Sequence, residues 1–227
     1  MANLIITIDG PAASGKSTAA RLLAQRIGAS FLDTGAMYRA VTFAAMQAGV
    51  NLNEERQLLR ILEETPFHFG DEDGVMKVQI NGFDVSDQIR DPKVTKNAHY
   101  AASAPAVRLK LVEIQQEYAR HYHKIVTEGR DQGTVAFPKA DVKFFLTADI
   151  GVRSQRRHSE LLRKRTNSSL EAVQKAVEHR DASDENRKIG PLRPATDAIV
   201  VDTSNLDIRQ VVDTLLYYVK QKCSKKD

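Results

Sequence analysis

Residues 10–18, GPAASGKST, constrain the fold of this 227-residue chain more than any other feature. They match the pattern G-x-x-x-x-G-K-[ST], in which a glycine-containing loop joins a buried strand to a helix. The β-branched run at residues 4–8 reads as that strand, and an apolar stripe at residues 19–27, ending before Gly28, reads as the helix. This segment therefore predicts the first strand and helix of a parallel sheet with helices on its faces.

The chemistry of this loop points to a bound polyphosphate. Glycines let successive N–H groups face one anion, and the following helix adds the positive end of its dipole. In such loops the lysine, here Lys16, reaches the β- and γ-phosphates, and the next hydroxyl, here Ser17, ligates Mg²⁺. We expect ATP and Mg²⁺ at the loop residues Gly10, Pro11, Ala12, Ala13, Ser14, Gly15, Lys16, Ser17 and Thr18. The alternative is a plain connecting turn, and the motif by itself leaves the phosphoryl acceptor open.

The rest of the chain continues the alternation of strand and helix. Short apolar runs predict further strands, at residues 30–32, 125–127, 142–147 and 199–201. Between them, residues 65–90 differ, because two short alternating runs and the pair Asn81-Gly82 predict a hairpin. We therefore expect an α/β fold, with a phosphate-loop parallel sheet flanked by helices, a small antiparallel β insert and a basic helical lid. In a single domain, the core would occupy about residues 1–64, 91–150 and 190–227, the insert about 65–90 and the lid about 151–189.

Three polar clusters lie near the ends of predicted elements. The first, at residues 33–39, follows the second strand, and ligands of open parallel sheets lie beyond the carboxyl ends of the strands. Thr34, Tyr38 and Arg39 are therefore expected to face the phosphate loop, although an arginine in a first helical turn is often a surface residue.

The second and third clusters lie in the later half of the chain. Arg130 and Asp131 stand between two glycines directly after the strand at residues 125–127, where a local salt bridge is the alternative to a binding role. The third cluster follows a predicted helix at residues 169–179. Its members Arg180, Asp184 and Arg187 share one face if the helix continues, with a solvated surface helix as the alternative.

Taken together, these motifs resemble those of the bacterial cytidylate kinases, a family of phosphate-loop nucleoside monophosphate kinases. The resemblance rests on the phosphate loop, D-T-G-A-M-Y-R, P-x-V-R, G-R-D-x-G-T-V-x-F-P and R-D-x-x-D-x-N-R, and covers nearly the whole chain. It implies direct in-line transfer of the γ-phosphoryl group of ATP to CMP, and to dCMP, giving ADP and CDP or dCDP.

The resemblance also implies roles for individual residues. Arg39, Arg130 and Arg187 would bind the acceptor phosphate, Arg180 and Asp184 the sugar, and Thr34, Arg108 and Asp131 the cytosine. A carboxylate at Asp131 accepts a hydrogen bond from the amino group of cytosine, whereas uracil presents an acceptor there. His99 stands where the family often has a serine that holds the base, and an imidazole can also form that bond.

The basic stretch at residues 151–165 resembles the mobile lid of the monophosphate kinases. We expect Arg153 and Arg157 to close over the transferred group, and to act with Lys16 and Arg187 in catalysis. In isolation, such a helix is more often a solvated face or a weak nucleic-acid patch.

Composition and charge limit the classes of location and partner that the protein can have. No apolar run approaches the roughly 20 residues that span a bilayer, and no basic stretch precedes the first strand, so we expect no membrane anchor and no secretory signal. The single cysteine, Cys223, leaves no internal disulfide and fits a reducing cytoplasm. The net charge of +4 fits an anionic partner, which we expect to be small nucleotides rather than nucleic acid or membrane, with the chain a monomer. The alternatives are a kinase for uridylate or shikimate, and a nucleotide switch or nucleic-acid-binding ATPase.

Overall fold

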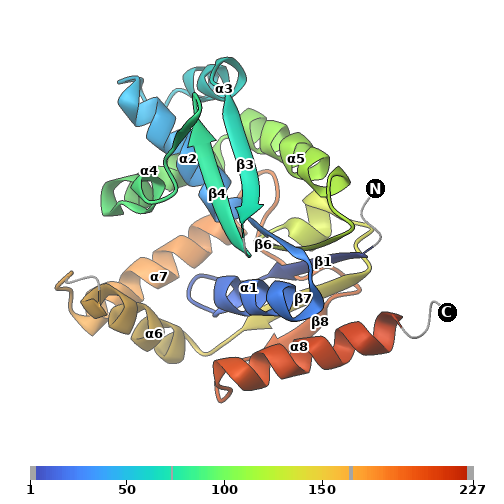
Figure 1. The fold of residues 1–227 in the computed structure, drawn as a ribbon. Coiled ribbons are helices and arrows are strands. Elements are labelled where there is room, and N and C mark those ends of the chain that lie inside the picture. The colour runs from blue at the N-terminus through green and yellow to red at the C-terminus, as the bar shows by residue number, and fades with distance from the viewer. Residues whose placement is uncertain (1–3, 73, 164–165, 224–227) are drawn as a thin grey trace. The chain divides into compact units, whose positions relative to one another are not determined.

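The computed structural model describes residues 4–72, 74–163 and 166–223. Residues 1–3, on which the expectation of no secretory signal partly rests, and Arg165, the end of the predicted basic stretch, lie outside these ranges. The main sheet has five strands in the order β2-β6-β1-β7-β8 and is flanked by helices, and a second sheet has the order β3-β4-β5 (Figure 1). The expected fold class is confirmed.

The elements follow the predicted alternation closely. The strands are β1 (Leu4–Asp9), β2 (Ser30–Asp33), β3 (Phe67–Glu72), β4 (Val75–Ile80), β5 (Phe83–Asp84), β6 (Lys124–Gly129), β7 (Val142–Thr147) and β8 (Ile199–Asp202). The helices are α1 (Lys16–Ile27), α2 (Thr34–Gln47), α3 (Glu55–Glu64), α4 (Pro92–Ser103), α5 (Pro105–Arg120), α6 (Ile150–Arg163), α7 (Leu170–Glu185) and α8 (Ile208–Cys223). Short turns of 3₁₀ and π type lie at Gln88–Arg90 and Gln132–Ala136.

Contacts divide the chain into two compact units. Unit 1 comprises Met1–Ile5 and Ala24–Glu128. In it β2 pairs in parallel with β6, Ser30 lying opposite Ile125, and the small sheet is antiparallel. Asn81 and Gly82 join β4 to β5 with φ angles of 53° and 81°, so the predicted hairpin is confirmed.

Unit 2 comprises Ile6–Leu23 and Gly129–Asp227. Its strands are parallel, with Ile6 opposite Val142 on β7 and Phe144 opposite Ile199 on β8. Because both faces of the sheet are covered, the inner strands are apolar, and Ile6 and Ile8 are fully buried. None of the helices within the described ranges has the length and apolar character that crossing a membrane requires.

Two helices depart from the sequence expectation. Helix α7 continues to Glu185 rather than ending near residue 179, so Arg180 and Asp184 lie on it and Arg187 follows directly after it. Helix α3 was not predicted. Its apolar residues Leu58, Ile61 and Leu62 recur at i, i+3 and i+4, so this short stripe was a usable signal in the sequence.

Candidate active site

The backbone of the phosphate loop in unit 2 requires glycine at its first position. A Cβ atom on Gly10 would lie 2.1 Å from the carbonyl oxygen of Leu146, so the strand-to-loop turn at this place requires glycine. Ala13 and Gly15 both have positive φ angles, 59° and 88°, which curl the loop before α1 begins at Lys16. The ammonium group of Lys16 donates to the carbonyl oxygen of Pro11 at 2.9 Å, and the residue is 5% exposed. The lysine is thus held inside the loop at a helix N-terminus, where a phosphate is favoured.

The donor groups of the loop fit ATP and Mg²⁺. The hydroxyl of Ser14 is buried and has no hydrogen-bond partner among the residues that the structure describes, so it is a donor that a phosphate oxygen would satisfy. Ser17 and Thr18 are exposed in the first turn of α1. A hydroxyl oxygen is the kind of hard ligand that Mg²⁺ prefers.

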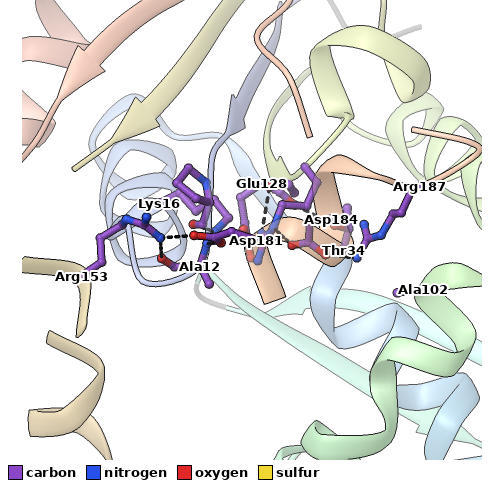
Figure 2. A network of polar contacts seen from close by, with 12 residues as sticks. Ala12, Lys16, Thr34, Ala102, Glu128, Arg153, Asp181, Asp184 and Arg187 are labelled. Atoms are coloured by element: carbon purple, nitrogen blue, oxygen red, sulfur yellow. Dashed lines mark hydrogen bonds and ion pairs between the residues drawn. The ribbon is translucent and has the colours of Figure 1, made fainter. Parts of the chain in front are cut away.

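Helices α6 and α7 brace this loop (Figure 2). The backbone N–H of Ala12 donates to Oδ1 of Asp181 at 3.0 Å, while Nη1 of Arg153 donates to the carbonyl oxygen of Ala12 at 3.1 Å. Arg153 and Asp181 also form an ion pair with each other. The side chains of Ala12, Val173 and Val177 form a small buried cluster beneath these contacts.

The two predicted lid arginines lie in different surroundings. Arg153 is 9% exposed; its Nε donates to the carbonyl oxygen of Ala148 at 2.9 Å and its Nη1 to that of Ala12, so the guanidinium lies against the backbone of the phosphate loop. Arg157 is partly exposed and pairs with Glu160 on its own helix at 2.7 Å. Arg153 is thus bonded to the phosphate loop through Ala12, whereas Arg157 pairs with the partly exposed Glu160.

Three arginines predicted to bind the phosphoryl acceptor lie around the buried carboxylate of Asp184. These four residues, Arg130, Arg180, Asp184 and Arg187, form the Asp184 cluster. Asp184 is 2% exposed, accepts from Nε of Arg130 at 2.6 Å, and forms an ion pair with Arg187. Burial alone would raise the pKa of Asp184, but Arg130, Arg187 and nearby Arg180 outweigh burial and lower it. Arg180 is exposed, yet the surrounding protein desolvates its guanidinium; this desolvation and the charge of Arg130 lower the pKa of Arg180 to about 10, so it remains a cation at neutral pH. Three cations around one anion leave a net positive charge, which suits a phosphate.

Replacing Asp184 with alanine is expected to destabilise the fold by about 3–5 kcal/mol at pH 7, because it leaves two largely buried arginines without their anion. Since the folded pKa of Asp184 is depressed, its contribution is complete above the unfolded pKa of about 3.9 and is lost as the pH falls through the lower folded value. Urea unfolding of both proteins from pH 7 to pH 3 measures this difference.

The matched control is Glu64→Ala, which removes another carboxylate that accepts from an arginine Nε, here Arg60 at 2.8 Å. Both side chains of that pair are mostly exposed, so its loss should cost only about 0–1 kcal/mol. Equal costs for Asp184→Ala and Glu64→Ala would contradict the account of the Asp184 cluster.

Asp131 begins the π-type turn Gln132–Ala136, and a second carboxylate supports that turn. The carbonyl oxygen of Asp131 accepts the N–H groups of Val135 at 2.8 Å and Ala136 at 3.2 Å, and the residue is 4% exposed. The carboxylate of Asp9, at the end of β1, accepts from the N–H groups of Gln132 and Gly133. Asp9 was not predicted from the sequence, although an acidic residue that ends an otherwise apolar strand was a usable signal.

In unit 1 the cluster at residues 33–39 is organised by Asp33. Its Oδ1 accepts from the N–H of Ala36 at 2.9 Å and caps α2, while Oδ2 lies 3.2 Å from Nη2 of Arg39 and 3.7 Å from Nη2 of Arg90. The Nε of Arg39 is buried without a hydrogen-bond partner in the described part of the chain. The hydroxyl of Thr34 donates to the carbonyl oxygen of Glu128 at 2.8 Å (Figure 2). Arg90 was not predicted, since nothing in its sequence surroundings distinguishes it from a surface arginine.

The remaining predicted residues of unit 1 lie on α2, α4 and α5. Arg108 is 2% exposed, donates to the carbonyl oxygen of Ala102 at 2.9 Å, and places its guanidinium carbon 5.4 Å from the centre of the Tyr38 ring. Tyr38 and Arg108 are therefore brought together, with the cation over the ring. His99 is exposed, and its Nδ1 bonds to the carbonyl oxygen of Lys96 at 2.8 Å, within its own helix.

Comparison with known proteins gives a consistent result. The family model of the cytidylate kinases matches residues 6–221. The cytidylate kinase of Streptococcus mutans is 42% identical over 215 residues, which cover 94% of each protein, and that of Nocardia farcinica is 41% identical over 221 residues, which cover 97% of this chain and 95% of the relative. The crystal structure of an uncharacterized protein from Eubacterium ventriosum has a TM-score of 0.52 at 12% identity and covers 96% of this chain and 99% of its own, a likeness of fold alone.

Proposed function

The chain belongs to the cytidylate kinase family, and we propose that it transfers the γ-phosphoryl group of ATP to CMP, and also to dCMP. The observation that carries this proposal is the dual use of α7. Asp181 bonds to the phosphate loop, and Asp184, three residues further along the same helix, holds Arg130 and Arg187. One helix thus bears a residue bound to the proposed donor site and a residue at the proposed acceptor-phosphate site, about one turn apart.

The proposed chemistry needs positioning and charge neutralisation rather than proton transfer, because the attacking acceptor phosphate is already an anion. Lys16 would contact the β- and γ-phosphates, and Arg187 and Arg157 would neutralise charge that develops on the transferred group. Arg153 would act by holding the carbonyl of Ala12 and hence the loop. The hydroxyl of Ser17 would hold Mg²⁺, which would supply positive charge to offset the negative charge of the phosphates. We propose residues 151–189 as the lid that keeps water from this reaction.

Arg39, Arg130 and Arg187 are proposed to bind the phosphate of the acceptor, and Arg180 and Asp184 its sugar. Thr34, Tyr38, His99, Arg108 and Asp131 are proposed for its base. The buried donor of Arg39 supports the phosphate assignment, since a ligand oxygen would satisfy it. We place the β insert, at about residues 65–90, on the acceptor side.

A substrate panel tests the proposal. ADP release from ATP and Mg²⁺ is measured with a coupled assay in the presence of CMP, dCMP, UMP, AMP or shikimate. We expect strong stimulation by CMP and dCMP, and at least tenfold less by UMP, since a carboxylate facing O4 of uracil leaves buried acceptors unpaired at a cost of roughly 1–3 kcal/mol. Stimulation by another acceptor alone would keep the kinase activity and overturn the base assignment. Stimulation by none would overturn the proposed function.

The proposed substrates are small nucleotides, and we propose that the chain works on them as a monomer in the cytoplasm. Gel filtration and cell fractionation test these two points independently of the enzyme assay. A stable dimer at assay concentrations would overturn the proposal that the chain is a monomer.

A further inference from the structure

The carboxylate of Asp9 has an unusual place in unit 2. Asp9 ends β1 and directly precedes Gly10, the first residue of the phosphate loop. It is 4% exposed, and its two oxygens accept from the backbone N–H groups of Gln132, at 2.9 Å, and Gly133, at 2.8 Å. The donors lie 123 and 124 residues further along the chain, in the segment that follows β6. Asp9 therefore joins the start of the donor loop to the loop that bears Arg130 and Asp131.

Burying a carboxylate costs free energy unless hydrogen bonds or opposite charges compensate for the lost water. Burial raises the pKa of Asp9 to about 7, although the two backbone hydrogen bonds and the charge of Arg130 lower it. An apolar residue at the end of β1 would avoid this cost. It would, however, leave the N–H groups of Gln132 and Gly133 unpaired in the interior.

Those two N–H groups belong to the turn that Asp131 begins. The carbonyl oxygen of Asp131 accepts hydrogen bonds from N–H groups later in the turn, at Val135 and Ala136. The first N–H groups of any helical turn have no carbonyl partner within it, and here Asp9 supplies the acceptors. The fit is tight, because a Cβ atom on Gly133 would lie 2.9 Å from Oγ1 of Thr7 and 3.4 Å from Oδ2 of Asp9. The side chains of Thr7 and Asp9, which lie on the same face of β1, thus both lie close to Gly133.

We propose that Asp9 is a positioning residue for acceptor recognition: by holding the N–H groups of Gln132 and Gly133, it fixes the adjacent Arg130 and Asp131 in the orientation that selects CMP over UMP. The inference rests on the proposed function, in which Asp131 reads the base. Asp9 touches no substrate and acts only through the turn.

The test is the Asp9→Asn variant, with kcat and KM measured for CMP, UMP and ATP. An asparagine side chain has one acceptor oxygen and presents an NH₂ donor to the second N–H group, so one of the two bonds is lost and replaced by a repulsive contact. We expect the preference for CMP over UMP, taken as the ratio of kcat/KM values, to fall at least tenfold. The KM for ATP should change less than about threefold, since Lys16 and Ser17 are not displaced.

A pH profile provides a readout that a purely structural role would not move. CMP and UMP carry the same phosphate, so their kcat/KM ratio cancels its titration. As the pH falls from 8 to 6, Asp9 gains a proton and loses one acceptor, and the preference of the wild-type protein for CMP should decline, while that of Asp9→Asn should stay flat. The charged groups nearest to Asp9 and the turn are Asp131 and Arg130, and Lys143 packs against Gly133; none of the three is altered in the variant.

The control is Asp202→Asn, which changes another aspartate at a strand end. Asp202 accepts from the N–H of Ser204 at 2.8 Å but is exposed. The control should keep the wild-type CMP preference. A folded Asp9→Asn protein with an unchanged ratio would overturn the inference, as would equal losses for CMP and UMP. A wild-type protein without preference for CMP would instead overturn the proposed function.

If Asp9→Asn fails to fold, Gly133→Ala displaces the same turn from its other side. Its added methyl group would collide with the hydroxyl of Thr7. We expect Gly133→Ala to lower the CMP preference at least tenfold, and a second change, Thr7→Ala, to restore a large part of it. A Gly133→Ala protein that keeps the full preference would count against the inference as decisively as an unaffected Asp9→Asn protein.

Discussion

Replacing Lys16 with alanine is expected to lower kcat for CMP phosphorylation about a thousandfold while the fold is retained. Lys16 is 5% exposed and is held at the first turn of α1 by its bond to Pro11. In the proposed reaction its ammonium group neutralises charge on the β- and γ-phosphates, and removing one preorganised donor of this kind costs roughly a hundredfold to a thousandfold. The upper end applies because a full positive charge, and not only a dipole, is lost. Steady-state turnover at saturating ATP and CMP measures the effect.

The matched control for this variant is Lys222→Ala, which removes an exposed lysine from the last turn of α8. It should keep wild-type turnover. Thermal unfolding of both variants separates loss of chemistry from loss of structure. A folded Lys16→Ala protein with turnover within tenfold of the wild type would contradict the proposed role of the phosphate loop.

Replacing Asp131 with asparagine is expected to lower the CMP preference about a hundredfold. A carboxylate accepts from the amino group of cytosine, whereas the NH₂ group of asparagine can donate to O4 of uracil. The change thus weakens the interaction with CMP and strengthens that with UMP, each by roughly 1–2 kcal/mol. The kcat/KM ratio for CMP against UMP, measured in the same assay, reports the combined effect.

The structure explains why Asp131→Asn should leave the turn intact. The carbonyl oxygen of Asp131, not its carboxylate, accepts the N–H groups of Val135 and Ala136. Because asparagine keeps the size and shape of the side chain, the free energy of unfolding in urea should change by about 1 kcal/mol, the centre of the range for single substitutions. Equal losses of kcat/KM with CMP and UMP would show that Asp131 does not read the base.

Much of the fold was predictable because local signals and tertiary environment agree. The strands β1 and β7 are buried on both faces and read as apolar runs, and Asn81-Gly82 takes the positive φ angles for which that pair is favoured. Helix α3 was missed although Leu58, Ile61 and Leu62 stand at helical spacing, because this apolar stripe is only about one turn long. The end of α7 was misplaced because its last turn, rich in polar residues, is stabilised by the ion pairs of Asp184 rather than by an apolar stripe.

The site was predictable in its residue types but not in its contacts. The phosphate loop is a contiguous motif, so its position before α1 followed from the sequence alone. The bond between Ala12 and Asp181 joins residues 169 apart, and the bonds of Asp9 span more than 120 residues. No periodicity or spacing encodes such pairs. The ion pair of Arg153 with Asp181, which directs that arginine to the loop backbone, depends equally on the packing of α6 against α7.

The most direct test of the central claim follows the phosphoryl group itself. The protein is incubated with CMP, Mg²⁺ and ATP labelled in its γ-phosphate, and the products are separated. The account predicts that the label appears in the β-phosphate of CDP, in amounts equal to the ADP formed, and that Lys16→Ala abolishes nearly all of it. Label found in inorganic phosphate, with CMP left unchanged, would contradict the account and identify the protein as an ATPase.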